Sequence, residues 1–117
     1  MSRVLVLAAV GEVATGAALL LVPSLVGQLL LGAELTGVAV TVARVAGIAL
    51  IGLGVACWPG TPLIGMLIYS AAVTLYLAYL GIAGSVNGIL LWPAVVLHAV
   101  LSALLTRANA RGKAAKA

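Results

Sequence analysis

Residues 38–58 read VAVTVARVAGIALIGLGVACW, a run of 21 residues that is apolar apart from Thr41, its glycines and Arg44. A helix of about 20 apolar residues is long enough to cross the hydrocarbon core of a bilayer, which is about 30 Å thick. A charge inside such a segment is costly unless a partner compensates it. Glu12 is the only acidic residue that lies in another apolar run, so we expect it to be that partner.

The composition excludes an ordinary soluble domain. The chain of 117 residues is 65% hydrophobic and only 7% charged, with a mean hydropathy of +1.34. Soluble domains are about half apolar and about a quarter charged. At about 20 residues per crossing, the chain has room for four spans with short loops. We therefore predict an all-α fold, an integral membrane bundle of four transmembrane helices.

Turn residues divide the chain into these spans. A short helix with apolar residues at 25, 26, 29 and 30 follows the first span, and we expect it to lie in the membrane interface or to extend the first span after a bend. The predicted transmembrane domain is 1–106, and 107–117 is a basic tail. The predicted spans cover about residues 4–22, 38–58, 63–82 and 89–106.

The positive charges predict the orientation. Arg3 and the tail residues Arg107, Arg111, Lys113 and Lys116 lie on one side of the membrane if the number of spans is even, whereas the connectors 23–37 and 81–88 contain no Lys or Arg. Because Lys and Arg favour the cytoplasmic side, both termini should be cytoplasmic. The wealth of Ala, Gly, Val, Leu and Arg suggests a GC-rich bacterial genome, which places the protein in a bacterial inner membrane.

Small residues recur every fourth position in the second span, at Ala39, Ala43 and Gly47. This spacing puts them on one helical face and lets another backbone approach closely. We expect this face to pack against a neighbouring helix.

The polar residues inside the spans are the candidate site. Depth counting places Glu12 and His98 near the midplane and lets Arg44 reach Glu12, while Tyr69 and Tyr76 are seven residues apart and share a face. We predict an intramembrane polar cluster of Glu12, Arg44, His98, Tyr76 and Tyr69. Two interpretations remain open, a buried ion pair that fixes which helices are neighbours and a working site.

The sequence offers little support for catalysis or for the binding of a metal, a cofactor or a nucleic acid. One histidine and one cysteine, Cys57, do not make a metal site, and there is no phosphate-binding loop or nucleophile triad. The net charge of +4 comes mainly from the last eleven residues, which is a topology signal. We expect no metal, no cofactor, no nucleic-acid partner and no enzymatic activity.

Four stretches resemble those of small four-span bacterial inner-membrane proteins that have no assigned activity: PSLVGQLLLG at 23–32, RVAGIAL at 44–50, LYLAYLG at 75–81 and LWPAVVLH at 91–98. Separately, GEVATG at 11–16 is similar to the first helix of small multidrug resistance transporters. That resemblance implies a dimer in which Glu12 binds protons and cationic drugs. Arg44 has no counterpart in those transporters.

Three functional hypotheses follow. The chain is a structural or accessory subunit that packs as a homo-oligomer or in a larger membrane complex, or a dimeric proton-coupled transporter working through Glu12, or a dimeric haem or quinone binder working through His98. In each case the lipid bilayer surrounds the chain.

Overall fold

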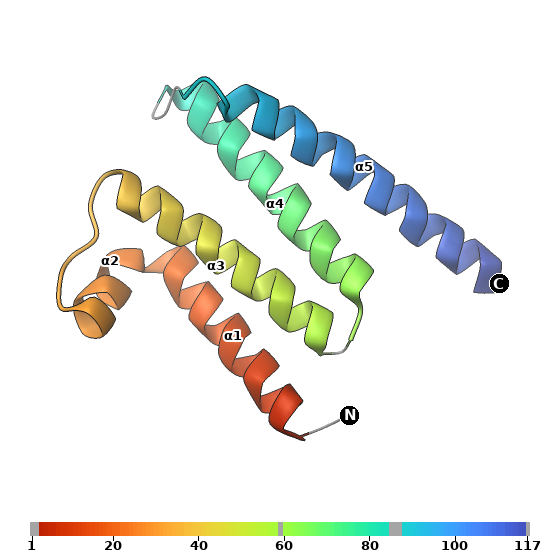
Figure 1. Ribbon diagram of the computed structural model, residues 1–117, viewed down its shortest axis with the longest axis horizontal. Coiled ribbons are helices and arrows are strands. Elements are labelled where there is room, and N and C mark those ends of the chain that lie inside the picture. The colour runs from red at the N-terminus through yellow and green to blue at the C-terminus, as the bar shows by residue number, and fades with distance from the viewer. Residues whose placement is uncertain (1–2, 59, 85–87, 117) are drawn as a thin grey trace. The chain divides into compact units, whose positions relative to one another are not determined.

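The computed structural model describes residues 3–58, 60–84 and 88–116, and within these ranges the chain forms helices and no strand. The long helices are α1 (Arg3–Leu21), α3 (Val38–Cys57), α4 (Pro62–Ala83) and α5 (Leu91–Lys116) (Figure 1). Between α1 and α3 lie the short helix α2 (Pro23–Val26) and the π-helical turn η1 (Gly27–Leu31). The predicted all-α class is confirmed.

The four long helices have 19, 20, 22 and 26 residues. At 1.5 Å per residue they measure about 28 to 39 Å, and each is long and apolar enough to cross a bilayer. The chain is a multi-pass membrane protein. The connectors predicted after the second and third spans include Pro59 and residues 85–87, which lie outside the described residues.

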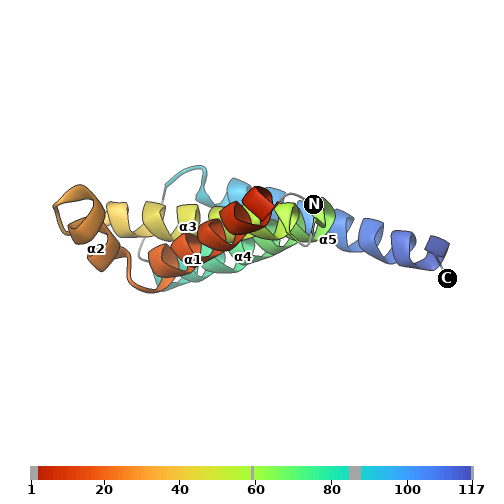
Figure 2. The same cartoon turned by 90° about the horizontal axis from the view of Figure 1, so that it is seen from below.

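The chain divides into two units, Met1–Gly65 and Met66–Ala117. In the first unit α1 and α3 run side by side in opposite directions (Figure 2). Gly16 of α1 meets Gly47 of α3 so closely that a Cβ added to either residue would lie 2.5 Å from the other's carbonyl oxygen. Glycine is required here because only a residue without a Cβ permits this approach of the two backbones.

The bend after α1 begins at Val22, whose φ of −135° and ψ of 58° are not helical, and Pro23 then opens α2. Because proline lacks an amide hydrogen and restricts the residue before it, the helix cannot continue straight through this point. The Ser24 hydroxyl donates a hydrogen bond to the Leu35 carbonyl oxygen at 2.9 Å, which ties α2 to the following loop. The turn η1 ends at Gly32, whose φ of 76° suits glycine.

The segment after the first span was expected either to lie in the membrane interface or to extend the span after a bend. The chain leaves helical geometry at Val22 and is helical again from Pro23, so the bend of the second expectation is present. Leu29 and Leu30 are 80% and 74% exposed in the chain, which fits an apolar face turned toward lipid.

In the second unit α4 and α5 are antiparallel neighbours. A Cβ on Gly81, near the end of α4, would meet the side chains of Leu91 and Trp92 at the start of α5. Pro93 lies in the first turn of α5, where a missing amide hydrogen costs little because the first amides of a helix have no partner within it. The same pair of helices brings Tyr69 of α4 to His98 of α5.

The basic tail is not separate in structure from the fourth span. We predicted that the span would end near Thr106, but α5 continues unbroken to Lys116. The physical reason is local, because residues 107–116 are rich in Ala, Arg and Lys, which are strong helix formers. Ala117 lies outside the described residues.

Candidate functional site

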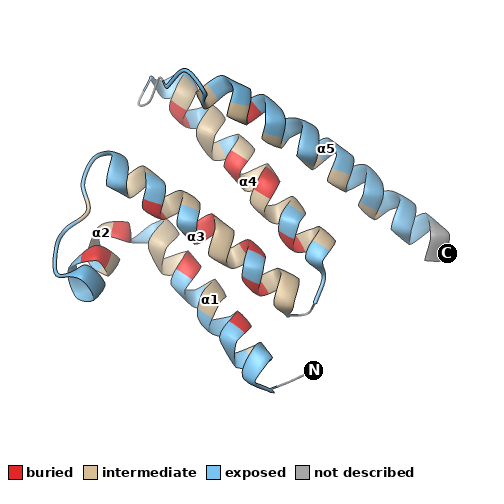
Figure 3. Ribbon diagram, viewed as in Figure 1, coloured by how far each residue is buried: buried red, intermediate tan, exposed pale blue. Residues whose placement is uncertain are grey.

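Glu12 and Arg44 flank the interface between α1 and α3. Glu12 lies one helical turn before Gly16, Arg44 lies one turn before Gly47, and both side chains are half-buried. Figure 3 shows the buried and half-buried positions along the faces of these two helices. The close contact between Gly16 and Gly47 therefore fixes the positions of Glu12 and Arg44 along the helix axes relative to one another.

The expected meeting of Glu12 with Arg44 is not seen. Within residues 3–58, 60–84 and 88–116, neither side chain forms an ion pair or a hydrogen bond. A Cβ on Gly16 would lie between Gly47 and Ile51, and one on Gly47 between Gly16 and Leu20, so in these antiparallel helices Glu12 lies to one side of the contact and Arg44 to the other. Arg44 is level with about residue 21 of α1, so the α-carbons of Glu12 and Arg44 are about 13 Å apart along the helix axes.

Few groups in the chain can neutralise the charge of Arg44. The only acidic residues are Glu12 and Glu34, and none occurs after residue 34. Glu34 is exposed in the connector before α3 and forms no ion pair in the described part of the chain. The helices α4 and α5 consequently offer Arg44 no carboxylate.

Tyr69 and His98 are brought together in the second unit. Their ring centroids are 5.9 Å apart and the ring planes are inclined by 71°, an edge-to-face arrangement. The His98 Nδ1 lies 2.8 Å from the Ala94 carbonyl oxygen. A carbonyl oxygen can only accept, so Nδ1 carries the hydrogen and donates it, which leaves Nε2 as the nitrogen available to another partner.

Three hydroxyl groups in α4 and α5 bond to their own helices. Ser102 donates to the His98 carbonyl oxygen at 2.7 Å, Thr106 to that of Ser102 at 2.8 Å, and Thr74 to that of Ser70 at 2.7 Å. Such back-bonding to the fourth preceding residue satisfies a hydroxyl inside a membrane without a second helix. These groups therefore do not need a ligand or a partner subunit.

The five-residue cluster extends over both units and stays a prediction. Glu12 and Arg44 belong to the first unit, whereas Tyr69, Tyr76 and His98 belong to the second. Of these, the structure joins Tyr69 to His98, while Tyr76 is half-buried and makes no hydrogen bond or ring contact among the described residues.

The small residues of α3 differ in their surroundings. Gly47 and Ala43 are buried, whereas Ala39 is exposed. Gly16 and Gly54, which the sequence reasoning did not single out, also belong to the α1–α3 interface, since a Cβ on Gly54 would clash with Val13 and with the Ala9 carbonyl oxygen. The missed signal is that Gly47 and Gly54 are seven residues apart and so share one face.

Among the described residues, no group of three His, Cys, Asp or Glu side chains could hold a metal ion. Cys57 is a free, half-buried cysteine at the end of α3. Comparisons of the chain with protein-family models, with curated proteins and with solved structures give no match.

Proposed function

We propose that this chain is a structural or accessory subunit that packs with itself or with a larger membrane complex. The observation that carries the proposal is the separation of Glu12 from Arg44. Two half-buried charges lie about 13 Å apart along the axes of two neighbouring spans, and neither has an ion-pair partner in the described part of the chain. Because unpaired charges are costly in a membrane, groups outside the first unit are needed to compensate them, and we assign this role at least in part to another chain.

A second copy of the chain does not by itself bring Glu12 and Arg44 to the same depth. In copies inserted the same way, Glu12 of one and Arg44 of the other keep the same difference in depth. A partner protein with one polar group at the depth of Glu12 and another at the depth of Arg44 compensates both charges. This geometry favours a larger complex over a simple dimer of this chain.

The proposed setting is the inner membrane of a bacterial cell, with both termini in the cytoplasm and no enzymatic activity. Its support is the charge distribution, with Arg3 at one end and the basic residues of α5 at the other. Reporter fusions at Lys116 should report the cytoplasm, and a cysteine at Glu34, in a Cys57→Ala background, should be labelled from outside. A periplasmic carboxyl terminus would contradict the orientation.

Photo-cross-linking tests the association itself. Ala8 is one turn before Glu12 on the same face of α1, whereas Val10 is about 160° away, and both are exposed in the chain. A photoreactive residue at Ala8 should cross-link to a polypeptide in native membranes, and the same residue at Val10 should capture mainly lipid. Lipid capture alone at both positions would refute the proposal.

A second candidate function is a dimeric proton-coupled transporter working through Glu12. The observation that favours it is again the separation of Glu12 from Arg44. A carboxylate that Arg44 does not neutralise can receive a proton or a cation. Glu12 is also the middle residue of α1. The position therefore suits a carboxylate that binds its ligand within the bilayer.

Proton release tests this second candidate. Addition of tetraphenylphosphonium to the purified protein in weakly buffered detergent should release protons if the cation and the proton compete for Glu12. Glu12→Gln is the control that abolishes the release. An equal signal from both proteins, or none from either, would dismiss the transporter.

A further inference from the structure

The end of α5 carries two arginines at the level where a membrane helix leaves the bilayer. From Leu91 to Lys116 the helix has 26 residues and measures about 39 Å, roughly 9 Å more than the hydrocarbon core. Arg107 lies about 24 Å and Arg111 about 30 Å from Leu91. The pair therefore lies at the boundary between acyl chains and headgroups.

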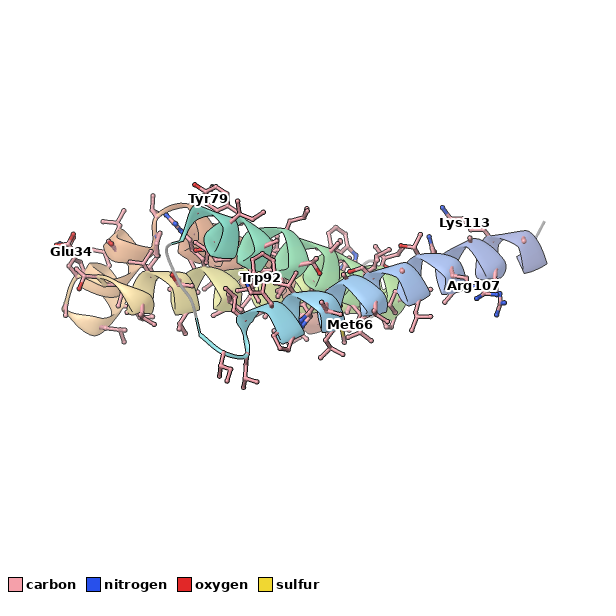
Figure 4. The ribbon with its side chains drawn as sticks, turned by 90° about the horizontal axis from the view of Figure 1, so that it is seen from above. Glu34, Met66, Tyr79, Trp92, Arg107 and Lys113 are labelled. Carbon is pink, nitrogen blue, oxygen red and sulfur yellow. The ribbon has the colours of Figure 1, made fainter. Side chains whose placement is uncertain are left out.

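The continuous helix fixes these arginines on one face. Residues four apart are neighbours on a helix surface, with β-carbons about 5 to 6 Å apart. Because side chains on a helix lean toward its N-terminus, the Arg111 side chain covers the turn that holds Arg107. Lys113 is about 120° away from Arg107, and Figure 4 shows the two side chains on opposite sides of α5.

Nothing in this part of the chain competes for the two guanidinium groups. Both residues are exposed and form no ion pair in the described residues, and the sequence has no acidic residue after Glu34. The nearby Thr106 hydroxyl is already bonded to the Ser102 carbonyl oxygen. The site thus offers two planar donor groups and a double positive charge without an internal counter-ion.

We propose that Arg107 and Arg111 together bind the phosphate group of an anionic phospholipid in the adjoining leaflet. Guanidinium groups present paired donors that match the oxygens of a phosphate, and a lipid phosphate lies at the depth of these residues. A basic residue near an anionic membrane surface contributes roughly a fivefold gain in affinity. Both arginines together therefore contribute about 25-fold.

Native mass spectrometry of the full chain in neutral detergent measures this binding directly. Phosphatidylglycerol is titrated against phosphatidylcholine for the wild type, Arg107→Gln, Arg111→Gln, the double variant and the matched control Lys113→Gln. We expect each single arginine variant to lose about fivefold in affinity for phosphatidylglycerol, and the double variant about 25-fold. Lys113→Gln should lose clearly less affinity than either arginine variant, since Lys113 lies off this face and lysine lacks the paired donors.

Two further arms separate the sources of phosphate and the nature of the contact. Millimolar inorganic phosphate should not displace the lipid, and Arg107→Lys with Arg111→Lys should keep only part of the affinity because lysine lacks the paired donors. Equal losses in Lys113→Gln and the arginine variants, unchanged binding in the double variant, or displacement by inorganic phosphate would each overturn the proposal. Circular dichroism confirms that each variant keeps its helix content, so unfolding is not mistaken for lost binding.

Discussion

Replacing Gly47 by alanine tests the α1–α3 interface most severely. The added Cβ would lie 2.5 Å from the Gly16 carbonyl oxygen, 3.0 Å from the Leu20 amide nitrogen and 3.1 Å from the Leu19 Cβ. Two of these three atoms belong to the backbone of α1, so no side-chain rotation can relieve the clash. The helices must instead move apart.

The size of that movement follows from the same distances. Ordinary contact to a Cβ begins at 3.4 Å, so the Gly16 carbonyl oxygen must retreat by about 0.9 Å. Overpacking of this kind typically costs about 1 to 3 kcal/mol. We expect Gly47→Ala to lower the free energy of unfolding by an amount in this range. Gly16→Ala should behave alike, because its Cβ would lie 2.5 Å from the Gly47 carbonyl oxygen.

Unfolding by SDS in mixed micelles, followed by circular dichroism, measures the effect. Gly11→Ala is the control for helix propensity, since Gly11 lies in α1, as Gly16 does, and its Cβ would meet nothing within 4 Å. Alanine favours helix over glycine by up to about 1 kcal/mol, so this control should be neutral or stabilising. The double variant of Gly16 and Gly47 should lose less than the sum of the two, because one separation of the helices relieves both clashes. A Gly47→Ala protein as stable as Gly11→Ala would refute the packing.

The same unfolding assay tests three other pairs of residues. The losses from Glu12→Ala and Arg44→Ala should add to within about 0.5 kcal/mol, because the side chains do not meet, and a larger coupling energy would show that they do. Tyr69→Leu and His98→Leu should instead be coupled by about 0.5 to 1.5 kcal/mol through their edge-to-face contact, and simple additivity would disprove it. Ser24→Ala should cost about 0.5 to 1.5 kcal/mol by removing the hydrogen bond to Leu35, whereas an unchanged stability would mean that the bond contributes nothing.

The four spans were predictable because each depends on local sequence alone. A run of about 20 apolar residues has few alternatives to a membrane helix, whatever its neighbours are. The ends were less predictable, since Pro62 opens α4 and the fourth helix begins at Leu91, two residues later than expected. Helix α5 also continues beyond the predicted end of the span at Thr106, since a change from apolar to basic residues does not by itself end a helix.

The relation between Glu12 and Arg44 could not be predicted from depth counting. That reasoning assumes that neighbouring helices start level with one another. The structure sets the register by the fit of Gly16 to Gly47, and Leu19 and Leu20 also lie against Gly47. Arg44, one turn farther along, is therefore near the level at which α1 ends. The offset between helices depends on side-chain shapes at the interface, which counting residues within each helix does not include.

The mass of the assembly in native membranes tests the central proposal most directly. The full chain is extracted in polymer-bounded lipid particles without detergent and weighed by native mass spectrometry, together with Glu12→Leu. We predict that the wild-type chain of 11.6 kDa occurs in a larger protein assembly and that Glu12→Leu weakens this assembly. A single chain of 11.6 kDa surrounded only by lipid, with the same mass in both proteins, would contradict a role as a packing subunit.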